Sequence, residues 1–104
     1  MNPAAEVANR ALEHEGWARE RLAAHAGRVF VVVIGPVATG FRIDSSGKLE
    51  STPLAGRTPD LTLTLSPFGV ISLLARPEGW KDYVAAEGDP LLAATLQDLA
   101  RTLI

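Results

Sequence analysis

The two histidines, His14 and His25, are the side chains best suited to metal or acid–base chemistry in a chain that contains no cysteine. They lie in a stretch rich in Ala, Glu, Arg and Leu, which predicts a long helix from Ala4 to Ala26 that Gly27 ends. Eleven residues separate the two histidines, which on a helix is about 16 Å, too far for both to bind one metal ion. We therefore expect packed or solvated histidines, no metal site and no cofactor.

Two glycine-containing segments match catalytic motifs only in part. Gly35 to Gly40 has the glycine spacing of a phosphate-binding loop, but Phe41 and Arg42 stand where that loop needs Lys and Ser or Thr. We interpret the segment as a hairpin turn. Ser45-Ser46-Gly47 lacks the preceding glycine and the strand-to-helix setting of a nucleophile elbow, and is also expected to be a turn. The sequence thus predicts a protein that is not an enzyme.

The stretch from Pro59 to Leu99 has the most informative pattern in the chain. Apolar and polar residues alternate from Asp60 to Ser66, which predicts a half-buried strand with three leucines on one face, Leu61, Leu63 and Leu65. Ser66 followed by Pro67 is a helix N-cap signal, and the next residues, Phe68 to Leu74, form an apolar helical stretch. This helix is apolar around most of its circumference, which suits either a helix between the core and a ligand or an ordinary buried helix.

A further strand and a last helix follow a break at Arg76 to Gly79. Tyr83 to Glu87 is predicted as the strand, and Trp80 and Tyr83 either flank the mouth of a cavity or pack in the core. Asp89 before a proline is interpreted as a helix cap rather than a catalytic acid. The last helix should dock one face on the core, with four leucines on that face, Leu92, Leu96, Leu99 and Leu103.

The segment from Arg28 to Ile34 is apolar at nearly every position, so both faces of the strand it predicts should be covered. Helices can cover one face. The other needs a ligand, a second subunit or a further segment, or else remains an exposed patch. Ala38 to Asp44 predicts the next strand, and Leu49 to Leu54 a weaker one.

Size, charge and hydropathy narrow the class of protein. A chain of 104 residues with 47% apolar and 21% charged residues is expected to form one folded domain. A net charge of -2 without a basic cluster argues against a nucleic-acid partner. The longest apolar run, Val29 to Ile34, is far shorter than the roughly 18 residues of a membrane span, and we expect a cytoplasmic protein.

The order of these elements resembles the sterol carrier protein 2 family, whose small domains hold a lipid between a curved sheet and helices. The residues that carry the resemblance are the run from Arg28 to Ile34, the strand from Asp60 to Ser66, and Gly88-Asp89 before the last helix. It covers nearly the whole chain and points to members that assist bacterial ubiquinone biosynthesis. It implies an α+β fold: a mostly antiparallel five-stranded sheet covered on one face by helices, with an apolar cavity between the layers.

The same resemblance implies a non-catalytic carrier of polyprenylated ubiquinone precursors, whose partners are the enzymes of that pathway and a UbiK-like helical accessory protein. Such relatives continue into a charged helical region, so residues 1–104 are either a shorter relative or part of a longer chain. Two other functions stay open: a protein-interaction module, which could dimerise through Val29 to Ile34, and a domain of a larger enzyme. The residues expected to line the lipid cavity are Leu61, Leu63, Leu65, Phe68, Ile71, Leu74, Leu92, Leu96 and Leu99.

Overall fold

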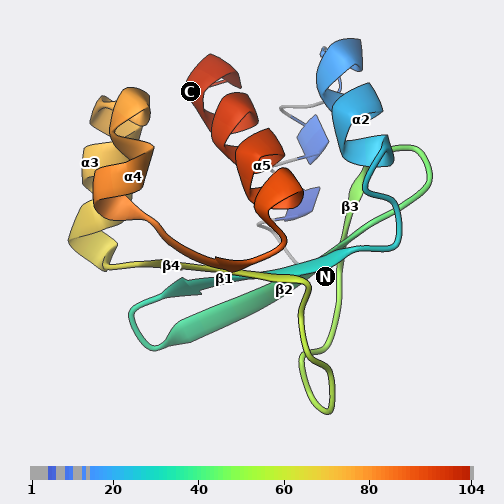
Figure 1. Ribbon diagram of the computed structural model, residues 1–104, viewed down its shortest axis with the longest axis horizontal. Coiled ribbons are helices and arrows are strands. Elements are labelled where there is room, and N and C mark those ends of the chain that lie inside the picture. Colours follow the sequence, from blue (N-terminus) through green and yellow to red (C-terminus); the bar gives the residue numbers. More distant parts are fainter. Residues whose placement is uncertain (1–4, 7–8, 11–12, 14, 104) are drawn as a thin grey trace.

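A single five-stranded sheet with helices on one face forms the fold in the computed structural model, which describes residues 5–6, 9–10, 13 and 15–103 (Figure 1). The strand order is β3-β2-β1-β4-β5, and only β1 and β4 pair in parallel. The strands are β1 (Val29–Ile34), β2 (Val37–Ile43), β3 (Leu49–Ser51), β4 (Leu61–Leu65) and β5 (Ala85–Gly88). The predicted α+β architecture with a mostly antiparallel sheet is confirmed.

The helices divide into three groups over this sheet. In Figure 1, α5 lies over the middle, α2 lies over the end near β3, and α3 and α4 lie together at the opposite end. Their bounds are α2 (Gly16–Ala23), α3 (Pro67–Ala75), α4 (Trp80–Tyr83) and α5 (Pro90–Leu103), with a 3₁₀ turn at Pro77–Gly79.

The expected single helix from Ala4 to Ala26 is wrong in its extent. Glu15 has non-helical backbone angles (φ -124°, ψ 78°), and α2 begins only at Gly16 and ends at Ala23. The Glu15 carbonyl accepts the N–H groups of the first turn, and its carboxylate accepts the Trp17 indole N–H at 2.7 Å. A glycine here favours the break, because it loses more backbone entropy in a helix than any other residue. The first part of the predicted helix, His14 included, lies largely outside the described residues.

The core forms where the helix-facing sides of β1, β2 and β4 meet α5. Phe30 lies opposite Phe41 on β2, with the two rings stacked 5.2 Å apart, and opposite Leu61 on β4. Leu61 on β4 and Leu92 on α5 are fully buried, so the packing of α5 on these strands forms the centre of the core. Burying each such side chain contributes about 1.5–3 kcal/mol.

The connection from β3 to β4 covers part of the other face of the sheet. A chain that leaves the β3 edge and enters the sheet again beside β1 must cross that face, and in doing so it places Leu54 against Gly40. Gly40 lies opposite Val31, which is buried but does not belong to the helix-side core. The prediction that both faces of β1 are covered therefore holds for its first half, Val29 to Val31, and this chain supplies the cover. Its second half is only partly buried.

The predicted caps and turns are confirmed, with one local correction. The Ser66 hydroxyl accepts the Gly69 N–H at 2.9 Å, and Gly47 closes the turn after β2 with a positive φ of 83°. Tyr83 was expected to begin a strand, but it ends the short helix α4, and β5 starts at Ala85. The Val84 N–H bonds the Trp80 carbonyl, and this helical turn outweighs the β-propensity of Tyr and Val.

Candidate functional site

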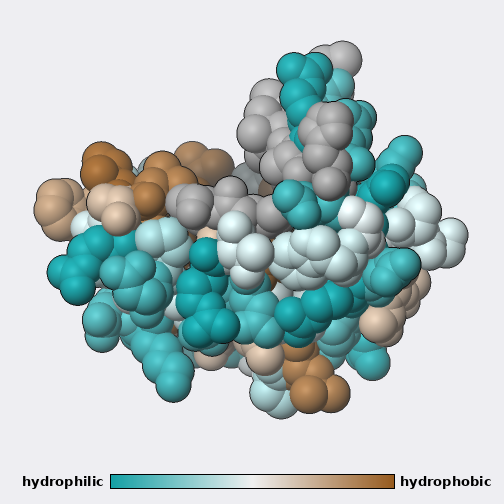
Figure 2. Space-filling view, turned by 90° about the horizontal axis from the view of Figure 1, so that it is seen from above, coloured by the Kyte–Doolittle hydropathy of each residue, from teal (hydrophilic) through white to brown (hydrophobic). Residues whose placement is uncertain are grey.

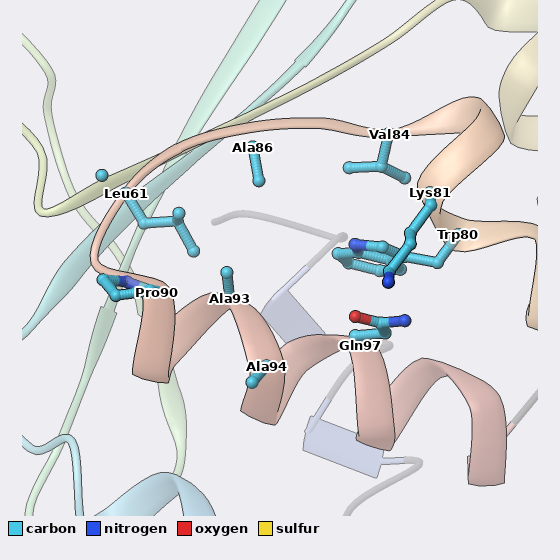
Figure 3. Close-up of a pocket in the computed structure, with 10 residues that line it drawn as sticks. Leu61, Trp80, Lys81, Val84, Ala86, Pro90, Ala93, Ala94 and Gln97 are labelled. Atoms are coloured by element: carbon cyan, nitrogen blue, oxygen red, sulfur yellow. The ribbon is translucent and has the colours of Figure 1, made fainter.

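An open cavity of about 360 Å³ lies between α4, β5 and α5 (Figure 3). Its floor is the β4–β5 edge of the sheet, α4 forms one wall and α5 the other. The residues that line it are Leu61, Trp80, Lys81, Val84, Ala86, Gly88, Pro90, Ala93, Ala94 and Gln97. This is a small volume for a ligand site, since pockets for small molecules usually measure about 300–1,000 Å³.

Small side chains create this space. Ala86 on β5 and Ala93 on α5 point toward one another across the cavity in Figure 3, and neither reaches far enough to fill it. Ala86 pairs with Leu63, so it shares the helix-facing side of the sheet. A large residue at either alanine would occupy the cavity.

Lys81, Gln97 and Trp80 supply the polar groups of the cavity. Figure 3 shows the Lys81 ammonium, the Gln97 amide and the Trp80 indole nitrogen on the cavity side of their elements. Trp80 is buried while Lys81 is exposed, so the indole forms the wall and the ammonium lies at the mouth. The arrangement is that of an apolar site with a polar rim.

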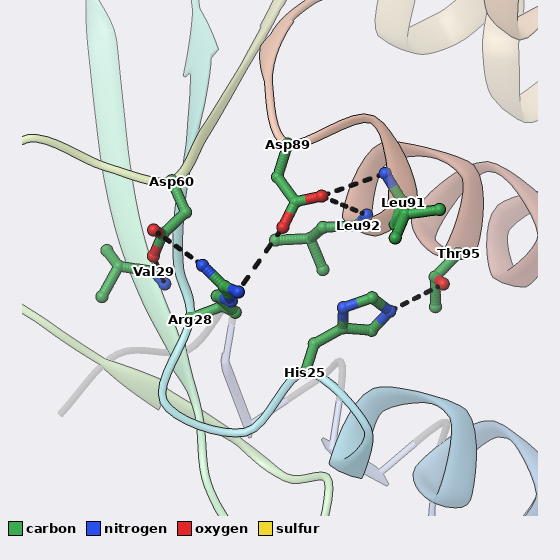
Figure 4. A network of polar contacts seen from close by, with 8 residues as sticks. All are labelled: His25, Arg28, Val29, Asp60, Asp89, Leu91, Leu92 and Thr95. Atoms are coloured by element: carbon green, nitrogen blue, oxygen red, sulfur yellow. Dashed lines mark hydrogen bonds and ion pairs between the residues drawn. The ribbon is translucent and has the colours of Figure 1, made fainter.

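A polar network holds α5 in place above the sheet (Figure 4). The Asp60 carboxylate accepts the Val29 N–H at 2.8 Å, and the Asp60 carbonyl accepts the Asp89 N–H at 2.8 Å. Arg28 lies 3.5 Å from Asp60 and 4.0 Å from Asp89. The starts of β1, β4 and α5 are thus joined at one point, which fixes the angle at which α5 leaves the sheet.

Asp89 serves this network as a helix cap, as the sequence predicted. Its Oδ1 accepts the N–H groups of Leu91 and Leu92 at 3.0 and 3.1 Å. The Leu92 N–H in particular lowers the pKa of Asp89 from its ordinary value of 3.8, with smaller contributions from Leu91, Arg28 and His25. These hydrogen bonds hold the Asp89 carboxylate at the start of α5, which indicates a structural role rather than acid catalysis.

The residues predicted to line a lipid cavity fall into two separate groups in this structure. Leu61, Leu63, Leu65, Leu92 and Leu99 are buried in the core, and Leu96 packs partly buried against it. Of these, only Leu61 also borders the cavity described above.

The second group lies on the outer surface of α3. Phe68, Ile71 and Leu74 are 76%, 66% and 58% exposed, so α3 is not the buried helix that was one of the two interpretations. Figure 2 shows the corresponding hydrophobic surface at the end of the molecule where α3 lies. These three residues form an apolar stripe at helical spacing, which we call the α3 stripe.

Sequence reasoning named one other cavity residue, Trp80, and missed the rest. Tyr83, proposed with it for the mouth, packs partly buried against the core. The signal that was missed is a pair of alanines, Ala86 and Ala93, whose side chains face the space between the sheet and α5. At other inward-facing positions larger side chains fill the core, whereas these two alanines leave a space.

The other candidates for chemistry have structural roles. The His25 ring forms a hydrogen bond of 3.0 Å with the Thr95 hydroxyl, and Ser46 donates to Asp44 in the predicted turn. Gly35 turns the β1–β2 hairpin with a φ of 57°. Among the described residues, no three His, Cys, Asp or Glu side chains lie close enough to hold a metal ion. No helix in the described part of the chain is both long and apolar enough to cross a membrane.

Solved structures define the class of fold. No family model matches the chain, and no curated protein sequence is detectably similar to it. The fold is nevertheless that of sterol carrier protein 2 domains. The sterol carrier protein domain 2 of Helicoverpa armigera matches with a TM-score of 0.59 and 22% identity over 97% of this chain and 85% of that one.

The match to one particular domain, the UbiJ-SCP2 ubiquinone synthesis protein, is stronger. That domain superimposes with a TM-score of 0.69 and 15% identity over 95% of this chain and 86% of its own. A third match is a piece of an enzyme, the sec-alkylsulfatase Pisa1 from Pseudomonas sp., with a TM-score of 0.55 and 17% identity over 82% of this chain but only 14% of that one. The predicted sterol-carrier-like fold, with its likeness to UbiJ, is confirmed.

Proposed function

We propose that this protein is a non-catalytic, lipid-binding accessory protein that uses the cavity between α4, β5 and α5 to hold an apolar ligand. The observation that carries the proposal is an apolar cavity with a polar rim in a sterol-carrier-like fold. A carrier needs apolar surface to shield its cargo and no reactive groups. Each CH₂ group that the cavity removes from water contributes about 0.8 kcal/mol to binding.

The cargo that we propose is a polyprenylated precursor of ubiquinone, in a bacterial cytoplasm. The likeness to UbiJ-SCP2 supports this choice, because that protein is a ubiquinone synthesis protein. A polyprenyl tail is too long for 360 Å³, so α5 must move away from the β4–β5 edge to extend the cavity among the core leucines. In this proposal the predicted lining residues of the core, Leu61 to Leu65 and Leu92 to Leu99, contact the tail once the cavity opens. The pathway enzymes and a UbiK-like protein would receive or support the loaded carrier.

Binding of the neutral apolar fluorophore N-phenyl-1-naphthylamine tests the carrier proposal. Ala86→Phe fills the cavity from an exposed edge strand and should abolish the fluorescence increase on binding. Ala85→Phe is the matched control, because Ala85 pairs with Thr64 on the other face of the sheet. Equal binding by both variants, or no binding by the unaltered protein, would contradict the proposal.

A protein-interaction module is the second candidate, and the α3 stripe favours it. Three large apolar side chains on one helix face are the kind of surface that a partner or a second copy covers. Replacing Ile71 with Gln should then weaken association in sedimentation experiments while probe binding stays unchanged.

The alkylsulfatase match supports a third arrangement, the same domain within a larger enzyme. The reading frame around this sequence would show whether it encodes such an enzyme, and so separates this arrangement from the carrier and from the interaction module.

A further inference from the structure

The two edges of the sheet differ in how their backbone groups are satisfied. At the β3 edge the Asn9 side-chain amide takes the place of a neighbouring strand, because it donates to the Leu49 carbonyl and accepts the Leu49 N–H, both at 2.8 Å. At the β5 edge no group in the described part of the chain does the same. An unpaired edge is a template on which another extended chain can add a strand.

The pairing of β4 with β5 shows which backbone groups of β5 are free. The Asp89 N–H donates to the Asp60 carbonyl, and hydrogen-bonded pairs alternate along an antiparallel ladder. Every second residue of β5 therefore bonds β4, and the N–H and C=O groups of the residues between, Ala86 and Gly88, point away from the sheet. Within the described ranges these outward groups have no hydrogen-bond partner.

The β5 strand also lacks the features that usually keep an edge strand from pairing, such as Lys, Pro or a covering helix. All four of its residues are exposed, and three of them are Ala or Gly. Its one charged side chain, Glu87, lies opposite Thr62, on the sheet face away from the cavity. An incoming strand would therefore meet neither a bulky nor a charged obstacle on the cavity side.

The cavity between α4, β5 and α5 borders the same strand and can receive a side chain of the added one. Ala86 points into the cavity in Figure 3, and a residue paired with Ala86 places its own side chain on that face. Lys81 lies at the mouth and has no ion pair with any described residue. The site thus complements an apolar side chain beside Ala86 and an acidic one beside Lys81.

We propose that the β5 edge binds an extended segment of a partner protein, which adds antiparallel to β5 as a further strand. The segment has an apolar residue opposite Ala86 and an acidic residue two positions later, on the same face, beside Lys81. A second copy of this chain fits poorly, because its own β5 offers only Ala86 and Gly88 on that face, which neither fill the cavity nor pair with Lys81. This inference goes beyond the carrier function, since it assigns a docking site for a protein.

Titration of the isotopically labelled protein with the peptide acetyl-Thr-Val-Thr-Leu-Thr-Glu-Thr-amide tests the inference by NMR. We expect the bound peptide to protect the Ala86 and Gly88 amides from hydrogen exchange. The same peptide with an N-methylated leucine keeps every side chain but loses the donor that faces the Ala86 carbonyl. It should bind about tenfold more weakly, a loss in the range of the hydrogen bonding it disrupts.

Two variants of Ala86 test the same edge from the side of the protein. Ala86→Pro removes an outward N–H and leaves the ladder to β4 intact, since proline is tolerated on edge strands. It should weaken binding of the unmethylated peptide about tenfold, while Ala86→Ser, which keeps the N–H, should bind like the unaltered protein.

No binding by the unaltered protein at millimolar peptide, equal binding of the two peptides, or equal binding by the two variants would overturn the inference. Binding of N-phenyl-1-naphthylamine reports the carrier function separately, so the carrier function and this docking site can fail independently.

Discussion

The backbone N–H of Asp89 donates to the carbonyl of Asp60 at 2.8 Å, and this contact joins the first residue before α5 to the first residue before β4. Both carboxylates face Arg28, and the Asp60 carboxylate also accepts the N–H of Val29. The cavity opens directly beyond this point, between β5 and the first turns of α5. The pair therefore fixes the start of α5 beside the cavity.

The capping role of Asp89 predicts a dependence of stability on pH. Its pKa is lowered in the folded protein, so the native state binds fewer protons than the unfolded state near pH 4. The stabilisation is present above the unfolded value of 3.8 and is lost as pH falls through the lower folded value. Urea midpoints measured from pH 6 to pH 2.5 should therefore decline over the acid part of this range.

Asp89→Asn separates charge from capping in the same experiment. Asn caps helices about as well as Asp but does not titrate, so the variant should fold at pH 6 and show a shallower acid decline. Asp44, whose pKa is also lowered, mainly by the Ser46 hydroxyl, supplies part of the remaining decline. Identical pH profiles for the variant and the unaltered protein would refute this role of Asp89.

Neighbouring leucines of α5 should differ sharply in their contribution to stability. Leu92 is fully buried and Leu91 is 73% exposed. We expect Leu92→Ala to lower the free energy of unfolding by about 2–5 kcal/mol, because it leaves a cavity in the core. Leu91→Ala should change it by less than about 0.5 kcal/mol. Chemical denaturation measures both, and similar losses would mean that α5 does not dock as described.

The close approach of Leu54 to Gly40 is also open to a test. A β-carbon at Gly40 would overlap the Leu54 side chain and the Thr52 carbonyl, so Gly40→Ala should destabilise the domain by about 1–3 kcal/mol. Leu54→Ala should recover part of that loss. Gly16→Ala is the control, since nothing lies near its added methyl group in α2 and Ala favours a helix. If Gly40→Ala were neutral, the crossover segment could not cover the sheet in this way.

Local signals in the sequence were enough to predict most of the fold. Alternation around Leu63 defined β4, and the Ser66 and Asp89 caps marked where α3 and α5 begin. These features depend on neighbouring residues and on the periods of helix and strand, which a sequence displays directly. The break at Glu15 was missed because the residues on both sides of it favour a helix by composition. In the structure Glu15 has non-helical backbone angles, and its carboxylate accepts the Trp17 indole N–H.

The candidate site was harder to predict, because a cavity is defined by absent side-chain volume. A helical wheel places Phe68 with the core as readily as with the surface, and only the position of α3 at the end of the sheet shows that Phe68 is exposed. Ala86 and Ala93 carry no chemical signal of their own. They become informative once β5 and α5 are placed opposite one another.

Mass spectrometry of organic extracts from the protein, purified out of a ubiquinone-producing bacterium, tests the central claim most directly. The account predicts co-purifying polyprenyl quinones or their precursors, retained by Ala85→Phe and by the unaltered protein and lost from Ala86→Phe. An extract without such lipids, or an equal lipid content in the two folded variants, would contradict the claim that this cavity carries ubiquinone precursors.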